Sequence, residues 1–106
     1  MTETIIREFR INSTYKGYYL IIDAVEFFVA NERRCIKITK DIYPYLSKKY
    51  QMPISCVERN IRTVIELCWN NNSTKVNDII GYDSIVKPSN GIFIEALAVR
   101  CIKQKK

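Results

Sequence analysis

Apolar residues recur at helical spacing along almost the whole chain, and runs of strict two-residue alternation are nearly absent. Three glycines and three prolines supply most of the breaks between the apolar stretches. The pattern predicts helices over about residues 5–12, 16–31, 39–50, 55–70, 76–80 and 90–102. We therefore expect an all-α fold, a compact bundle of five to seven helices, in a single domain over residues 1–106.

Signals at the helix ends refine these predictions. Thr39 is a candidate N-cap for the helix that runs to Tyr50, and Pro44 in its first turns predicts a late start or a kink. Ser55, followed three residues later by Glu58, has the spacing of a capping box. The basic connector over residues 32–37 is a candidate for a single helical turn.

The most regular stretch, residues 55–70, follows a short break at Gln51-Met52-Pro53. Its apolar stripe consists of Val57, Ile61, Val64, Ile65 and Cys68. Two helices joined by such a break predict a helix-turn-helix over about residues 39–70, whose second helix, the recognition helix, enters the major groove of DNA. The stripe would then leave Arg59, Thr63 and Glu66 facing outward, with Arg62 on the flank.

Positive charge is concentrated in the same region. The chain has 17 Lys and Arg against 11 Asp and Glu, and residues 33–62 alone carry eight basic and two acidic side chains, a surplus equal to the whole net charge of +6. Clustered cations favour a polyanion because binding releases counterions. A solvated basic face without a partner is the simpler alternative.

Within this window, each residue type suggests a role. The planar guanidinium of Arg59 matches guanine O6 and N7 together, so Arg59 is the leading candidate for reading bases. The candidates for phosphate contact or helix capping are Ser55, Arg34, Lys37, Lys40, Lys48 and Lys49.

Other chemistries find little support. The chain has no histidine, and none of its four cysteines forms a C-x-x-C pair, so neither a metal site nor a cofactor is expected. Scattered aspartates and the absence of a glycine-rich phosphate loop argue against an enzyme. RNA binding stays open on charge alone. The chain shows no apolar run long enough to span a membrane and no secretory signal at its start, so a cytoplasmic location is expected.

Several blocks of sequence carry a family resemblance. They are KGYYLIIDAVEFF, ITKDIYPYLSKKY, VERNIRTVIELCW, IIGY and KPSNGIFIEALA. In the same order, from about Ile5 to Arg100, these blocks resemble the C-terminal effector domain of the stage-zero sporulation response regulator. The resemblance implies a helical DNA-binding domain that recognises tandem promoter boxes and contacts the sigma factor of RNA polymerase. It also implies a monomer in solution that pairs on double-stranded DNA.

The family motif at the recognition helix, Ser-Arg-Val-Glu-Arg-Ala-Ile-Arg, places the base-reading residues. Its base-reading glutamate and arginine fall on Glu58 and Arg59, and a glutamate is able to accept from cytosine N4. The last arginine of the motif falls on Arg62, for which we expect a supporting role in base reading. Cys56 replaces a family arginine, and Thr63 replaces the usual histidine. We expect the Cys56 change to weaken or alter recognition of the family box and to expose a thiol there.

The family's phosphorylated receiver domain has no counterpart in this chain, so the resemblance covers the effector domain alone. The groove arginine missing at Cys56 leaves a second function open for a lone effector domain, namely a protein-interaction module that modulates a sigma factor or a full-length regulator without specific DNA binding. The segment from Lys75 to Tyr82 corresponds to the family's activating region, but the looser match assigns no residue there.

Overall fold

The computed structural model describes residues 2–11, 14–31 and 35–105. Its helices are α1 (Thr2–Arg7), α2 (Lys16–Ala30), α3 (Tyr43–Tyr50), α4 (Ile54–Ile80) and α5 (Asn90–Lys105), and a π-helical turn, η1 (Ile38–Ile42), leads directly into α3. The predicted all-α bundle is confirmed. None of the helices in the described part combines the length and the apolar character needed to traverse a bilayer.

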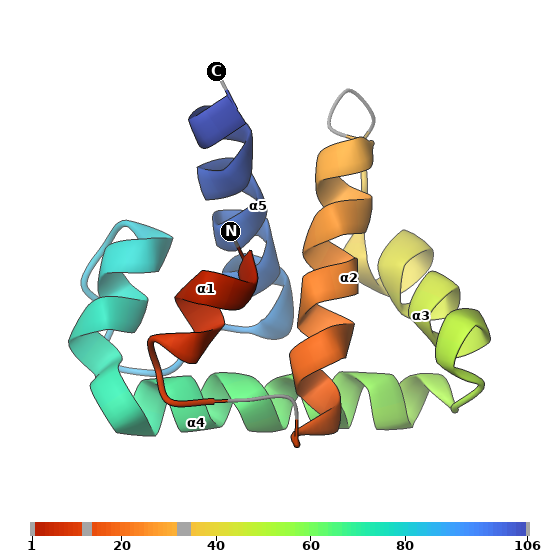
Figure 1. Cartoon of the computed structure of the whole chain (residues 1–106), viewed down its shortest axis with the longest axis horizontal. Helices are drawn as coiled ribbons and strands as arrows, with labels where there is room; N and C mark the ends of the chain where they lie inside the picture. The colour runs from red at the N-terminus through yellow and green to blue at the C-terminus, as the bar shows by residue number, and fades with distance from the viewer. Residues whose placement is uncertain (1, 12–13, 32–34, 106) are drawn as a thin grey trace.

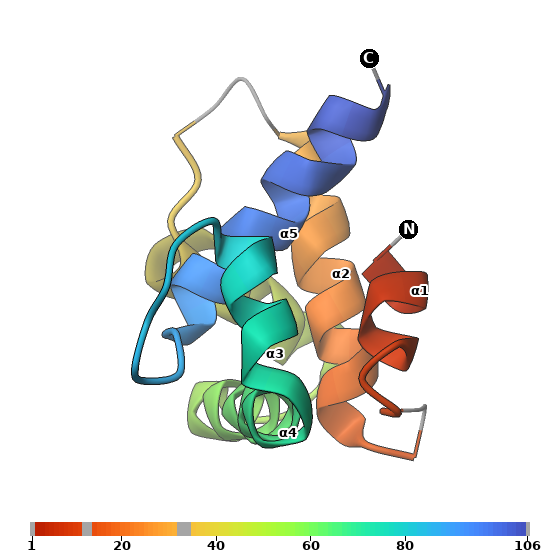
Figure 2. The same cartoon turned by 90° about the vertical axis from the view of Figure 1, so that its left-hand side faces the viewer.

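Helix α4 consists of two arms that meet at Asn72, where φ of −164° and ψ of 82° interrupt the helical backbone. The first arm (residues 54–71) lies across one end of the molecule beneath the upright helices α2 and α5, and the second arm (residues 73–80) turns upward (Figure 1). The break predicted at residues 70–73 is therefore confirmed, with the second helix resuming at once. Figure 2, which looks along the first arm, shows how sharply the second arm departs from it.

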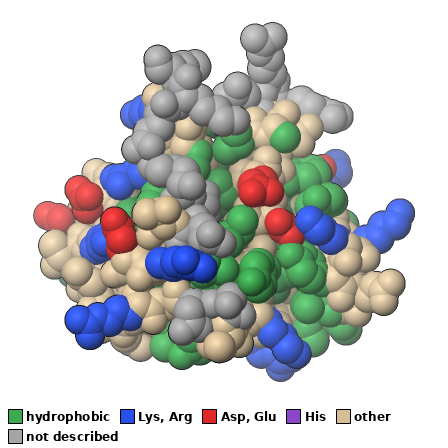
Figure 3. Space-filling view, viewed as in Figure 1, with side chains coloured by type: hydrophobic (Ala, Val, Ile, Leu, Met, Phe, Trp, Pro, Cys, Tyr) green, Lys and Arg blue, Asp and Glu red, His purple; other side chains and the backbone are tan. Residues whose placement is uncertain are grey.

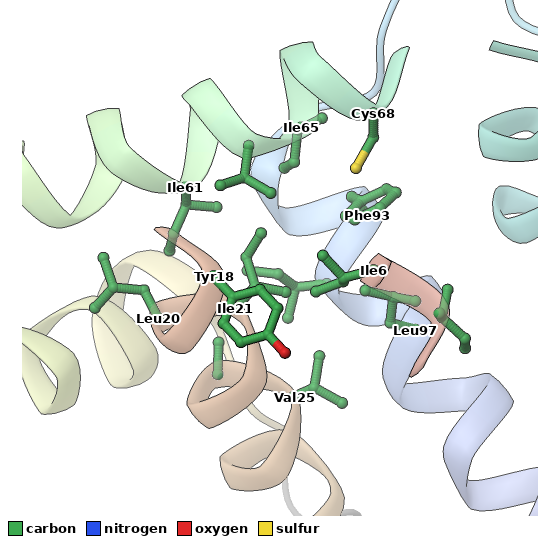
Figure 4. Close-up of a cluster of buried hydrophobic side chains, with 14 of the residues drawn as sticks. Ile6, Tyr18, Leu20, Ile21, Val25, Ile61, Ile65, Cys68, Phe93 and Leu97 are labelled. Atoms are coloured by element: carbon green, nitrogen blue, oxygen red, sulfur yellow. The ribbon is translucent and has the colours of Figure 1, made fainter. Parts of the chain in front are cut away.

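A single core joins α2, α4 and α5. Its central side chains come from all three helices and from α1 (Figure 4), among them Ile6, Tyr18, Ile21, Ile61, Ile65, Phe93 and Leu97. Burial of apolar surface on this scale is the main force that stabilises a domain of this size. The first arm of α4 is thus a wall of the core and cannot move independently of α2 and α5.

Gly17 lets α2 approach α4 more closely than any other residue would. A Cβ atom built on Gly17 would lie only 2.2 Å from the backbone oxygen of Asn60 and 2.6 Å from Cγ2 of Val64. Because hydrogen takes the place of that Cβ, the start of α2 rests directly on the backbone of the first arm. This contact fixes the depth at which the first arm of α4 is seated.

Some predicted helix ends are wrong. Thr39 is not an N-cap, because it lies inside η1, and the carboxylate of Asp41 instead accepts the backbone N–H of Lys37 at 2.9 Å. The late start predicted from Pro44 is confirmed, because α3 begins only at Tyr43; there is no kink, since Pro44 occupies the first turn, where a missing N–H costs little. Residues 35–37 are not helical, with Lys37 in an extended conformation, and residues 32–34 lie outside the described residues.

Candidate nucleic-acid interface

A three-residue turn joins α3 to α4. Gln51 adopts the left-handed conformation (φ 52°, ψ 52°), and the backbone N–H groups of Gln51 and Met52 both donate to the carbonyl of Ser47. The Ser47 hydroxyl donates in turn to the Met52 carbonyl. These bonds satisfy the hydrogen-bonding groups at the C-terminal end of α3 within the turn. They also fix the angle between α3 and the helix that follows.

The first arm of α4 begins at Ile54, one residue before the predicted start. Pro53 occupies the N-cap position without a side-chain bond, and its carbonyl accepts the N–H groups of Cys56 and Val57. The predicted capping box between Ser55 and Glu58 is therefore wrong, because Ser55 already lies in the first helical turn. Its side chain is exposed at the helix start.

The inward face of the first arm matches the predicted stripe. Val57, Ile61 and Val64 are fully buried against the core. The outward face carries Arg59 and Thr63, both exposed. The Arg59 guanidinium lies 3.4 Å from the Cys56 sulfur, and the Thr63 hydroxyl bonds to the Arg59 carbonyl at 3.0 Å. A rigid helix thus presents an arginine fork to solvent near its N-terminus.

The flank of the same arm carries a row of charges spaced four residues apart. Arg62 donates to the carboxylate of Glu58, one turn earlier, and both side chains are nearly half exposed. One turn later, Glu66 pairs with Lys87, which comes from the segment before α5. The proximity of Lys87 lowers the pKa of the Glu66 carboxyl below its ordinary value. The carboxylate of Glu58 is therefore used for an ion pair and not for capping.

The predicted phosphate-contacting residues fall into different environments. Lys40 and Lys48 are exposed, as is Lys37, and Arg34 lies outside the described residues. Lys49 is held by the Asp23 carboxylate of α2 at 3.0 Å and lies over the rings of Tyr45 and Tyr50. Asp23 also raises the pKa of the Lys49 ammonium. The structure therefore separates Lys48 from Lys49, which the sequence alone made equivalent.

On the face shown in Figure 3, Lys and Arg side chains are distributed over the middle and the lower part of the molecule, and Asp and Glu side chains lie among them in the middle. The basic residues of the window 33–62 that lie beside the α3–α4 turn are Lys48 and Lys49 at the end of α3 and Arg59 and Arg62 on the first arm of α4. Lys87, which lies outside residues 33–62, adds to this surface from a distant part of the chain through its ion pair with Glu66. The only sequence signal for Lys87 was the KPSN block itself.

Residues 2–101 match the family model described as sporulation initiation factor Spo0A C terminal. The chain belongs to this family. It is a family of DNA-binding effector domains that act in transcription regulation and sporulation, and it is not an enzyme family. The match spans both arms of α4, so the bent helix and its exposed arginines lie within the family's own domain.

Part of the Lys75–Tyr82 segment forms one wall of a groove. This groove, of about 710 Å³, lies between the second arm of α4 and α5 and is lined by Tyr82, Ile92 and Val99 among others. These three side chains are exposed to 54%, 43% and 39%. The groove is on a different part of the molecule from Arg59.

The prediction that Cys56 is the exposed thiol of this Spo0A-family domain is wrong. Cys35 is the exposed thiol, whereas Cys56 is half-buried beside Arg59 and Cys68 is fully buried. No group of three or more His, Cys, Asp or Glu side chains able to hold a metal occurs in the described part of the chain.

We expect thiol reagents to modify Cys35 first, Cys56 more slowly and Cys68 only on unfolding. Burial raises the pKa of the Cys68 thiol to about 12 from its ordinary value of 9.0. The folded state therefore keeps a proton that the unfolded state loses, so stability should fall as pH rises from about 9 to about 12. Mass spectrometry of iodoacetamide-treated protein gives the order of labelling, and equal rates at Cys35 and Cys68 would contradict the burial.

Proposed function

We propose that the domain binds a specific duplex sequence by placing the first arm of α4 in the major groove. The observation that carries this proposal is the position of Arg59, which is exposed near the start of a helix whose opposite face is buried in the core. The major groove admits one α-helix, and helix-turn-helix proteins read bases with the N-terminal residues of the second helix. Membership of the DNA-binding family supports the same conclusion.

Arg59 is the chief base reader in this proposal, with Glu58 and Arg62 in support. The Arg59 guanidinium is able to make two parallel bonds to one guanine. Arg62 is paired with Glu58 in the free domain, and this pair holds both side chains on the groove-facing flank. When the helix is seated, the Glu58 carboxylate accepts from cytosine N4 and Arg62 turns to a base or phosphate.

Cys56 makes the preferred sequence differ from the family box. A half-buried thiol is a weak donor and lacks the fork with which an arginine reads guanine. One base contact of the family is therefore replaced by a small apolar surface of the kind that packs against a thymine methyl group.

Selection of bound sequences from a random duplex pool tests this function. We expect an enriched motif in which Arg59→Ala relaxes one position, and two copies of the motif at a fixed spacing if domains pair on DNA. Equal recovery of all sequences would contradict specific recognition and would favour the interaction module. If the domain binds a purified sigma factor and shows no preference among duplexes, the result would support that same alternative.

Lys48 and Lys49 should differ in their contribution to DNA binding. We expect Lys48→Ala to weaken all duplexes alike and to reduce the slope of log K against log salt by about 0.9, as for one lost phosphate contact. Lys49→Ala should change this slope less, because the Lys49 ammonium is paired with Asp23, whose side chain is only 15% exposed, so this pair separates less readily than one between two exposed side chains. Anisotropy titrations at several salt concentrations measure both slopes, and a larger change for Lys49→Ala would contradict the pairing seen in the free domain.

A further inference from the structure

A second hollow, of about 540 Å³, lies between the flank of the first arm of α4, η1 and the segment that precedes α5. Its polar lining includes Thr39, Glu58, Arg62, Lys87 and Ser89. Two of these side chains are cations, and two others are hydroxyl groups able to donate to an anion. The hollow therefore has the polar groups of an anion contact directly beside the proposed base-reading residues.

The segment that carries Lys87 is firmly positioned. The Asn77 side chain bonds to both the N–H and the carbonyl of Ser84 at its start. At its end, the Asn90 side chain donates to the Glu58 carbonyl at 3.1 Å and to the Tyr43 hydroxyl at 2.9 Å. Pro88 is buried. Lys87 is thus presented from a segment tied to the recognition helix itself.

The carboxylate that holds Lys87 belongs to the recognition helix. Glu66 and Lys87 form an ion pair whose side chains are 49% and 37% exposed, and Arg62 lies one turn before Glu66 on the same flank. Exposed pairs of this kind contribute little to stability and separate easily. A helix of about 10–12 Å diameter fills a major groove of about 12 Å, so its flanks face the phosphate backbones.

We propose that Lys87 contacts a DNA phosphate from outside the helix-turn-helix, and that Glu66 masks Lys87 in the free domain. The inference rests on the proposed function, because it needs the first arm of α4 to lie in the major groove of the DNA. On binding, the phosphate takes the place of the Glu66 carboxylate at the Lys87 ammonium. Arg62, which lines the same hollow as Lys87, lies beside this phosphate. Glu66 thereby lowers the affinity for duplexes of every sequence.

Lys87→Gln tests the phosphate contact. We expect several-fold weaker binding to preferred and random duplexes alike, with the slope of log K against log salt reduced by about 0.9. Lys103→Gln is the matched control, because Lys103 is exposed on α5 and lines the protein groove between the second arm of α4 and α5, away from the proposed DNA contact. An unchanged slope for Lys87→Gln, or the same change in the control, would overturn the contact. Circular dichroism confirms that each variant is folded.

Glu66→Gln tests the masking. We expect several-fold tighter binding, and we expect most of this gain to vanish when Lys87→Gln is added. Glu95→Gln, which removes an exposed acid from α5, controls for net charge alone. A gain that persists fully in the double variant, or that Glu95→Gln reproduces, would overturn the masking.

These outcomes are distinct from failure of the proposed function. If the unaltered domain shows a duplex preference that depends on Arg59 while Lys87 and Glu66 have no effect, the function stands and the inference is wrong. If the unaltered domain binds no duplex, both are wrong.

Discussion

Replacing Arg59 with alanine should weaken binding to the preferred duplex by about 1–3 kcal/mol, which is roughly fivefold to 150-fold in affinity. The loss should be much smaller on random duplex, because a bidentate contact to guanine exists only at the preferred base. Specificity should relax at one position of the site. Anisotropy titrations of both duplexes at one salt concentration measure the difference.

Arg100→Ala is the matched control for this experiment. Arg100 lies on α5, where it pairs with Asp78 at 3.6 Å, and it lines the groove away from the first arm of α4. We expect this variant to bind both duplexes nearly as the unaltered domain does. Equal losses on preferred and random duplex for Arg59→Ala would show that Arg59 contacts phosphate only, and the base-reading role would fall.

Gly17→Ala should destabilise the fold by about 1–3 kcal/mol or more, the cost typical of overpacking. Alanine is normally the better residue in a helix, so substitution at an uncrowded site would stabilise α2. Here the new methyl group meets the backbone of Asn60, which cannot rotate away as a side chain would. Thermal unfolding should show a melting temperature lower by roughly 4–8 °C for each kcal/mol.

Gly91→Ala provides a close comparison, because each glycine is the second residue of its helix. At Gly91 the nearest atom to an added Cβ is Cγ2 of Ile38, at 3.3 Å, on a side chain that is able to shift. We expect the free energy of unfolding of this variant to lie within about 1 kcal/mol of that of the unaltered domain. A Gly17→Ala variant as stable as Gly91→Ala would mean that α2 does not approach the recognition helix as closely as described.

Periodicity predicted most of the helices, because each helix buries one stripe and the spacing of that stripe is a local property. The stripe Val57-Ile61-Val64 also predicted which face of the first arm is buried, and therefore that Arg59 is exposed. Helix ends were less predictable. Ser55 and Thr39 had suitable side chains for capping, but the backbone of Pro53 and the carboxylate of Asp41 supply those contacts.

Exposure of the individual thiols and lysines was not a local property. Cys56 lies on the edge of the stripe, so its half-burial depends on neighbouring side chains, including Arg59. Lys48 and Lys49 are adjacent in sequence, but only Lys49 reaches Asp23 across the α2–α3 contact. Lys87 and Glu66 are 21 residues apart, and their pairing depends on how the chain returns after the bend at Asn72.

Spacing along the chain was therefore enough to specify the helical class, the buried stripe of the recognition helix and the arginine opposite it, since these follow from about 100° of rotation per residue. The family membership was also legible in the order of the sequence blocks. The packing of distant segments determined which cations remain available to an anion, because ion pairing acts through space and not along the chain. That packing determines how closely the first arm of α4 approaches Gly17, and it places Lys87 beside Glu66.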